Sequence, residues 1–168
     1  LAGIPSVVYG YFALFYVAPV VLRDLFGVEV GTFSVLAAGI VLGIMIIPTV
    51  ASLSEDAMSA VPQSLRHGSL ALGVNRMRTT LRVVFPAAVS GITAAIVLGF
   101  SRAVGETMIV ALAAGTRATM VSNPTESGQT MTGFVAQTAT GESTPGTLTY
   151  NSLFAVGLAL FVLTFIIN

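Results

Sequence analysis

The sequence contains no cysteine and no lysine, and its only histidine is His67. Without cysteine there is no disulfide framework, and a single histidine leaves too few ligands for a zinc or haem site. A phosphate-binding loop of the G-x-x-x-x-G-K-[ST] type requires a lysine, so the chain cannot hold ATP through such a loop. We therefore expect a chain that is not an enzyme and carries no cofactor of its own.

Charge of either sign is also scarce. Charged residues make up 8% of the 168 residues, hydrophobic residues make up 55%, and the mean hydropathy is +0.93. These values lie outside the range of soluble domains. The composition predicts a membrane protein, with lipid as its surroundings and no nucleic-acid partner.

Four apolar blocks are long enough to approach or exceed the thickness of a bilayer. The first, at roughly 19 residues and ~1.5 Å of helical rise per residue, nearly crosses a hydrocarbon core. We predict an all-α, polytopic membrane protein whose residues 1–168 form one domain with four transmembrane helices. Because no initiator Met or basic segment opens the chain and no basic flank follows the last block, we expect truncation at the N-terminus and allow for it at the C-terminus. The blocks run from about Ile4 to Leu22, Phe33 to Leu53, Ala87 to Ala114, and Leu153 to Ile167.

The interval 54–86 is the one long polar stretch between apolar blocks. It contains four of the seven arginines, whereas the connections around Arg23 and Arg117 contain one each. Basic residues in short connections mark the cytoplasmic side of a membrane. The count therefore predicts that loop 54–86 and both chain ends are cytoplasmic.

Local signals predict short helices separated by turns within this loop. Ser54 is a favourable N-cap with acidic residues following it, and Pro62 can begin a second helix. Gly73 suits a left-handed C-cap, and Asn75 can cap another short helix. Pro86 is then expected to begin a new element.

Arg102 and Glu106 are four residues apart in the third apolar block. If that block is one helix, both fall on a narrow stripe with Gly91, Ala95 and Gly99 near the middle of the membrane. An unpaired charge there costs ~2.5–3.5 kcal/mol, so the two side chains must face protein or water. They could form an ion pair that fastens two helices together, or the planar fork of the arginine could attract an oxyanion.

From about Gly115 to Tyr150 the chain is rich in Thr, Ser and Gly. Met131, Phe134 and Val135 form a local apolar cluster, which predicts a short surface helix. We expect this helix to be exposed on the side opposite loop 54–86. Small exposed apolar patches often mark contacts with other proteins, although packing against the membrane surface or neighbouring spans is equally open.

The loop resembles the cytoplasmic EAA loop of ABC-importer permeases. In that family Glu-Ala-Ala, three residues, Gly, nine residues and Ile-x-Leu-Pro follow one another. The same spacing is kept here, with His-Gly-Ser in place of Glu-Ala-Ala, so the acidic residue is absent. The opening LAGIPSVVYG and the stretch RAVGETM, from Arg102 to Met108, are similar to the phosphate-permease branch, of the PstC type first and the PstA type next. The loop frame consists of His67, Gly68, Ser69, Gly73, Val83, Phe85 and Pro86.

The resemblance implies a permease subunit of an ATP-driven phosphate importer in the inner membrane of a prokaryote. The loop frame would couple the chain to ATPases, and Arg102 and Glu106 would line the substrate path. Implied partners are a second permease subunit, two ATPase subunits that bind ATP and Mg²⁺, and an extracytoplasmic phosphate-binding protein.

Three other functions remain open from the residues themselves. An ABC importer for another solute would share the loop, since the loop specifies the ATPase contact rather than the cargo. An anion channel or secondary carrier would need no ATPase. In a purely structural membrane subunit, the pair Arg102–Glu106 would serve only to fasten helices.

Overall fold

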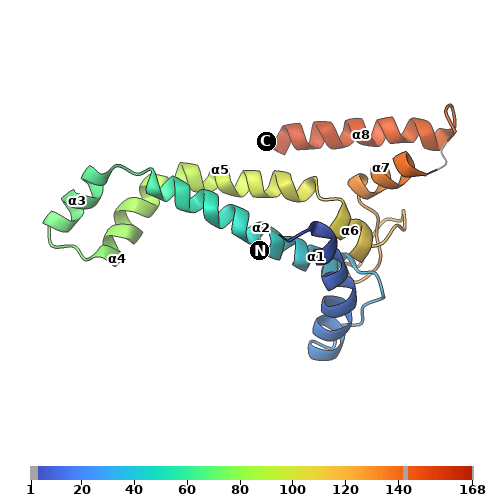
Figure 1. Ribbon diagram of the computed structural model, residues 1–168, viewed down its shortest axis with the longest axis horizontal. Coiled ribbons are helices and arrows are strands. Elements are labelled where there is room, and N and C mark those ends of the chain that lie inside the picture. Colours follow the sequence, from blue (N-terminus) through green and yellow to red (C-terminus); the bar gives the residue numbers. More distant parts are fainter. Residues whose placement is uncertain (1–3, 142–143, 168) are drawn as a thin grey trace. The chain divides into compact units, whose positions relative to one another are not determined.

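The computed structural model describes residues 4–141 and 144–167, and all regular secondary structure in these ranges is helical (Figure 1). This confirms the predicted all-α class. Leu1–Gly3, which open the LAGIPSVVYG stretch, lie outside the described residues. Within the described part, four helical stretches are long and apolar enough to span a membrane, as predicted. They are Ser6–Leu25, Val35–Ser59, Arg76–Val104 and Leu148–Ile167.

The chain forms two compact units, which are described separately. The first comprises residues 1–46 and 101–168, and the second comprises residues 47–100. The first unit contains the N-terminal span, the segment around Arg102 and Glu106, and the residues that follow them. The second contains the polar loop.

The N-terminal span begins as α1 (Ser6–Phe12) and continues as a π-helical segment, η1 (Ala13–Leu25), that includes Pro19. A proline cannot donate the backbone hydrogen bond of a regular α-helix, and its ring crowds the preceding turn. The wider π-helical turn accommodates such a residue. The sequence predicts the span but not its widened backbone.

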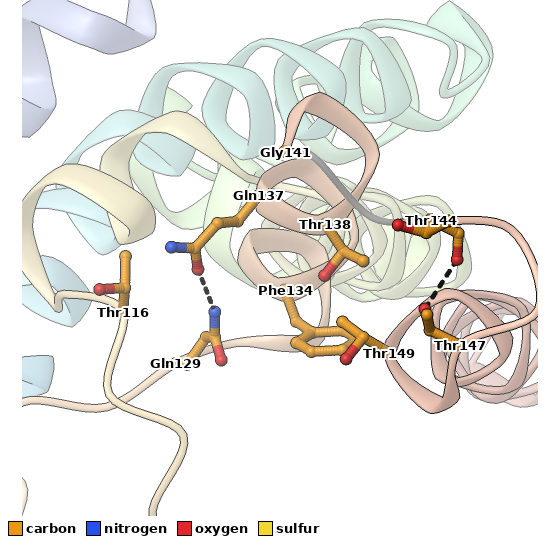
Figure 2. A pocket seen from close by; sticks show the side chains of 9 residues that line it. All are labelled: Thr116, Gln129, Phe134, Gln137, Thr138, Gly141, Thr144, Thr147 and Thr149. Carbon is orange, nitrogen blue, oxygen red and sulfur yellow. Dashed lines mark hydrogen bonds between the residues drawn. The ribbon is translucent and has the colours of Figure 1, made fainter.

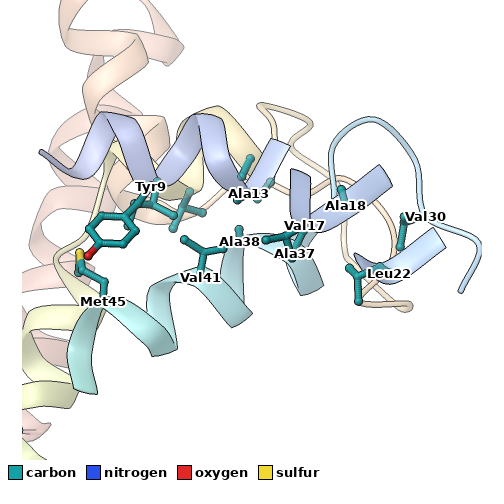
Figure 3. Packing of buried hydrophobic residues seen from close by; sticks show 14 residues of the cluster. Tyr9, Ala13, Val17, Ala18, Leu22, Val30, Ala37, Ala38, Val41 and Met45 are labelled. Carbon is teal, nitrogen blue, oxygen red and sulfur yellow. The ribbon is translucent and has the colours of Figure 1, made fainter. Parts of the chain in front are cut away.

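The core of the first unit is built mostly from small and β-branched side chains of α1, η1, α2 (Val35–Ser59) and α6 (Met108–Ala113), with Tyr9, Leu22 and Met45 as its larger members. Figure 3 shows Tyr9 beside Met45, with Val17, Ala37 and Ala38 between the helices. A Cβ at Gly10 would lie 3.0 Å from the Leu112 Cβ, so α1 can approach α6 this closely only because residue 10 is glycine.

The N-terminus of α2 is closed by the segment that follows α6. The backbone N–H groups of Val35 and Leu36 donate to the carbonyls of Glu126 and Pro124, at 3.0 and 2.7 Å. The first turn of a helix has N–H groups with no partner inside the helix. Residues 115–130 therefore complete α2 rather than forming a free loop.

In the second unit, α2 continues through Ser59, so the predicted helix start at Ser54 is wrong. Half-buried residues recur at helical spacing through its last turns, at positions 53, 54, 57 and 58, and this pattern favours continuation over capping. The Arg66 Nη2 donates to the Met58 carbonyl at 2.7 Å, which satisfies one carbonyl of the last turn with a cation.

Two short helices form the tip of the polar loop, α3 (Gln63–Ala71) and α4 (Arg76–Thr79). Pro62 precedes α3, and the Asn75 side chain accepts a hydrogen bond from the Arg78 N–H at 2.9 Å, as predicted. Gly73 has φ +80°, which confirms the left-handed C-cap. Ser69 and Thr79 are buried and share a hydroxyl hydrogen bond of 2.9 Å that joins α3 to α4.

The expectation that Pro86 begins a new element is wrong. Helix α4 passes through a π-helical turn, η2 (Thr80–Val84), directly into α5 (Phe85–Val104). The π turn lies immediately before Pro86, where a wider backbone relieves the missing hydrogen bond and the crowding of the ring. Proline here changes the helix geometry without ending the helix.

Two helices complete the first unit, α7 (Met131–Thr140) and α8 (Leu148–Ile167). α7 confirms the short helix predicted from the cluster at Met131, Phe134 and Val135. None of the residues of the candidate span Leu148–Ile167 is buried within this chain. Its apolar side chains are therefore surface, available to lipid or to another protein.

Candidate functional site

The predicted helix from Ala87 to Ala114 is interrupted. α5 ends at Val104, residues 105–107 are not helical, and α6 begins at Met108. Glycine at position 105 favours such an interruption because it weakens a helix interior. The prediction that Glu106 lies on the same helical stripe as Gly91, Ala95, Gly99 and Arg102 is therefore wrong, because the helix ends at Val104.

Arg102 lies in the last turn of α5 and is exposed. The carbonyl end of a helix carries partial negative charge, which favours a cation there. Among the described residues, no ion pair joins Arg102 to Glu106. The guanidinium of Arg102 is thus left open to a ligand or to another chain.

Glu106 has a different local role. Its Oε1 accepts hydrogen bonds from the backbone N–H groups of Met108, at 3.1 Å, and Ile109, at 3.4 Å. These are the first N–H groups of α6, so the carboxylate caps that helix. Because both bonds of this cap go to Oε1, the second oxygen, Oε2, retains capacity to accept another hydrogen bond.

Glu106 also lines a cavity of about 350 Å³ within the first unit. Most of the cavity wall is apolar, and Glu106 is the charged residue among those that line it. Arg102 does not line this cavity, although the adjoining Ala103 and Val104 do. The polar members of the wall are Glu106, Gln129, Thr130 and Thr132; the apolar members include Leu42, Val110, Leu160 and Leu163.

The glycine and alanine stripe of α5 packs against protein. A Cβ at Gly91 would lie 2.5 Å from the Ala57 Cβ, whereas Ala95 and Gly99 are buried. By contrast, a Cβ at Gly39 or Gly43 would meet nothing within 4 Å. In the second unit, small residues thus bring helices together rather than opening a passage.

The predicted loop frame divides into exposed and structural positions. His67, Gly68, Phe85 and Pro86 are exposed, while Ser69 is buried in its hydrogen bond with Thr79. The exposed positions leave the outer side of α3 and the start of α5 accessible. The apolar side chains Leu72 and Met77, 85% and 73% exposed, extend this accessible surface at the tip.

The apolar cluster on α7 is only partly exposed. Met131 is 42% exposed, whereas Phe134 and Val135 are half-buried. Figure 2 shows the Phe134 ring on the wall of a second cavity, of about 490 Å³, among threonine side chains and a Gln129–Gln137 hydrogen bond of 2.7 Å. The cluster is therefore part of a packed helix rather than an isolated surface patch.

Thr132 was not singled out from the sequence, yet it contacts the Glu106 segment directly, and Thr130 contacts Thr132. Thr132 Oγ1 donates to the Glu106 carbonyl at 3.0 Å across 26 positions of sequence. Neither a motif nor a period links two residues so far apart.

Within the described residues, no group of three or more His, Cys, Asp or Glu side chains could hold a metal ion.

Residues 1–168 match the protein family described as the binding-protein-dependent transport system inner membrane component, and the chain belongs to this family. With the four apolar helices, this makes it a multi-pass membrane component of a transport system. No solved structure matches the chain.

Several curated proteins are similar over nearly the whole chain. A probable ABC transporter permease protein, YqgH, of Bacillus subtilis is 39% identical over 99% of this chain and 53% of its own length. The phosphate transport system permease protein PstC 1 of Mycobacterium tuberculosis is 34% identical over 100% of the chain and 55% of its length. The probable phosphate transport system permease protein PstC of Methanocaldococcus jannaschii is 30% identical over 100% of this chain and 57% of its own length. The chain thus spans about half the length of these relatives.

Proposed function

We propose that the chain is part of a permease subunit of an ATP-driven importer of phosphate. The observation that carries this proposal is similarity along the whole chain to proteins named phosphate transport system permeases. The four apolar helices supply the membrane-spanning framework that such a subunit requires. ATP and Mg²⁺ would be bound by partner ATPases, since the chain has no lysine for a phosphate-binding loop.

Loop 54–86 is the proposed cytoplasmic contact with the ATPase. Four arginines favour that side of the membrane. The Gly73 cap and the Ser69–Thr79 hydrogen bond fix α3 and α4 as a compact tip that could transmit force. A second permease subunit and an extracytoplasmic phosphate-binding protein would complete the importer.

Arg102 and Glu106 are the proposed pathway residues. The open guanidinium of Arg102 can donate two parallel hydrogen bonds to an oxyanion. Glu106 can accept a hydrogen bond from a protonated phosphate oxygen, whereas sulfate at neutral pH offers no such proton. A carboxylate beside the path would therefore repel sulfate and tolerate phosphate.

The test is uptake of phosphate and of sulfate by proteoliposomes that contain the complete importer. Arg102→Lys keeps the charge but loses the fork, so KM for phosphate should rise roughly tenfold, the equivalent of ~1.4 kcal/mol. Glu106→Gln removes the repelling charge and should relax discrimination against sulfate. Arg117→Lys, at another exposed arginine, is the matched control and should resemble the parent. Parent rates and parent selectivity in both assembled variants would show that the pair has only a structural role.

A further inference from the structure

Thr132 lies at the first turn of α7 and is only 8% exposed. Its Oγ1 donates to the backbone carbonyl of Glu106 at 3.0 Å. Glu106 belongs to the non-helical residues 105–107; its N–H donates to the Ala103 carbonyl at 3.1 Å, whereas its own carbonyl accepts from Thr132 rather than from a later turn of helix. The Thr132 hydroxyl is thus a long-range tie to the segment that carries the proposed pathway carboxylate.

The tie is the end of a directed hydrogen-bond chain. Thr130 and Thr132 place their hydroxyl oxygens 3.1 Å apart, and either could be the donor in isolation. Thr132 has one hydroxyl hydrogen, which it gives to Glu106, so Thr130 must donate to Thr132. Thr130 Oγ1 in turn accepts from the Gly133 N–H at 3.2 Å. Bonds in such a chain polarise and strengthen one another.

Two different helices therefore hold the side chain and the backbone carbonyl of Glu106. Its carboxylate is held by the first N–H groups of α6, and its carbonyl is held by Thr132 of α7. Glu106, Thr130 and Thr132 all line the cavity of about 350 Å³. Without the Thr132 bond, only the N–H bond to Ala103 and the carboxylate cap on α6 would hold residue 106, so its carboxylate would be less precisely placed.

We infer that Thr132 is a positioning residue for substrate selection, acting through Glu106. This inference rests on the proposed pathway role of Glu106. Thr132 itself need not touch the transported anion. Its hydroxyl keeps the carboxylate where it can separate a protonated phosphate from an unprotonated oxyanion.

The experiment measures phosphate and sulfate uptake by the complete importer in proteoliposomes. Thr132→Val keeps the side-chain shape but removes the hydroxyl, and it should relax discrimination against sulfate by roughly two- to tenfold, the range of one neutral hydrogen bond. Thr132→Ser keeps the donor and should restore the parent ratio. Thr140→Val is the matched control, because Thr140 is an exposed α7 residue whose hydroxyl bonds only within its own helix, to Ala136 and Gln137.

A second comparison separates positioning from general damage. In a Glu106→Gln background, adding Thr132→Val should change the ratio no further, because the residue through which Thr132 acts has lost its charge. Thr132→Ala removes the same hydroxyl with less bulk and should behave as Thr132→Val does, with assembly checked by co-purification.

The outcomes distinguish this inference from the proposed function. If Glu106→Gln alters selectivity but an assembled Thr132→Val or Thr132→Ala importer keeps the parent ratio, the positioning role is wrong and the pathway role stands. Failure of Thr132→Ser to restore the ratio overturns the inference as well. If Glu106→Gln itself has no effect, the pathway role of Glu106 fails and the positioning role fails with it.

Discussion

At the scale of single residues, Gly91 shows how closely two helices of the second unit approach. A Cβ at this position would lie 2.5 Å from the Cβ of Ala57 and 3.6 Å from its Cα. Since carbon atoms pack at about 3.5–4.0 Å, one added methyl group must displace the α2 backbone. The contact depends on the absence of a side chain at Gly91.

Gly91→Ala should therefore destabilise the importer by about 1–3 kcal/mol, the usual range for overpacking. The measurement is the midpoint temperature of thermal unfolding of the purified complex in detergent. Gly39→Ala is the matched control: a Cβ there meets nothing within 4 Å, and alanine favours a helix over glycine by ~1 kcal/mol. Ala57→Gly should restore much of the stability lost in Gly91→Ala. Equal midpoints for Gly91→Ala and Gly39→Ala would contradict the close approach.

Arg102 and Glu106 also differ in electrostatic setting: Arg102 lies in the last turn of α5, and Glu106 lies within the break that follows it. Arg102 is stabilised at the carbonyl end of α5, and the Glu106 carboxylate is stabilised at the N–H end of α6. Each charge thus has a helix terminus as its partner. The sequence predicted that both side chains share one stripe, because a single helix with 3.6 residues per turn was assumed. That assumption fails where α5 ends, just before Gly105.

At the scale of elements, the turn after α3 is the most completely determined part of the loop. The Gly73 N–H donates to the Leu70 carbonyl at 2.9 Å, and the Val74 N–H donates to the Ser69 carbonyl at 3.3 Å. With φ +80° at Gly73, these two bonds form a Schellman motif. The turn sets the direction in which the chain leaves α3 for α4.

Gly73→Pro removes both the positive φ and the N–H donor, so the Schellman turn should be lost while the membrane spans remain folded. We expect ATP hydrolysis to become uncoupled from phosphate uptake in the reconstituted importer. Gly73→Ala retains the donor, has free space for its Cβ, and should cost only ~1–2 kcal/mol of left-handed backbone strain with coupling largely retained. Normal phosphate-stimulated hydrolysis and uptake in Gly73→Pro would exclude this loop as the coupling element.

The sequence predicts which helices form better than it predicts where each helix begins and ends. Long apolar runs fix the four spans, and short-range rules correctly placed the caps at Asn75 and Gly73. The prediction that Pro86 begins a new element was wrong, because a π-helical turn before it lets the helix continue. The Thr132–Glu106 bond was out of reach, since it depends on how α7 packs rather than on any local pattern.

At the scale of the whole molecule, the chain has more apolar surface than it can bury by itself. In the most apolar 18-residue stretch of the span Ser6–Leu25, only 33% is buried within the chain. In the corresponding stretch of Leu148–Ile167, 0% is buried. A lipid bilayer accepts such surfaces, and neighbouring membrane helices can pack against them. This fits the description of its family as an inner membrane component of a transport system.

We propose that the importer containing this chain takes up phosphate only when its ATPase subunits hydrolyse ATP. The most direct measurement is uptake of labelled phosphate by proteoliposomes that contain the complete permease subunit, its partner permease and the ATPases, with the binding protein supplied on the external side. We expect phosphate to accumulate against a gradient when ATP is inside the vesicles, and not to accumulate when ATP is omitted or when the ATPase is inactive. Phosphate uptake at an equal rate without ATP hydrolysis would contradict this proposal and favour a channel or a secondary carrier.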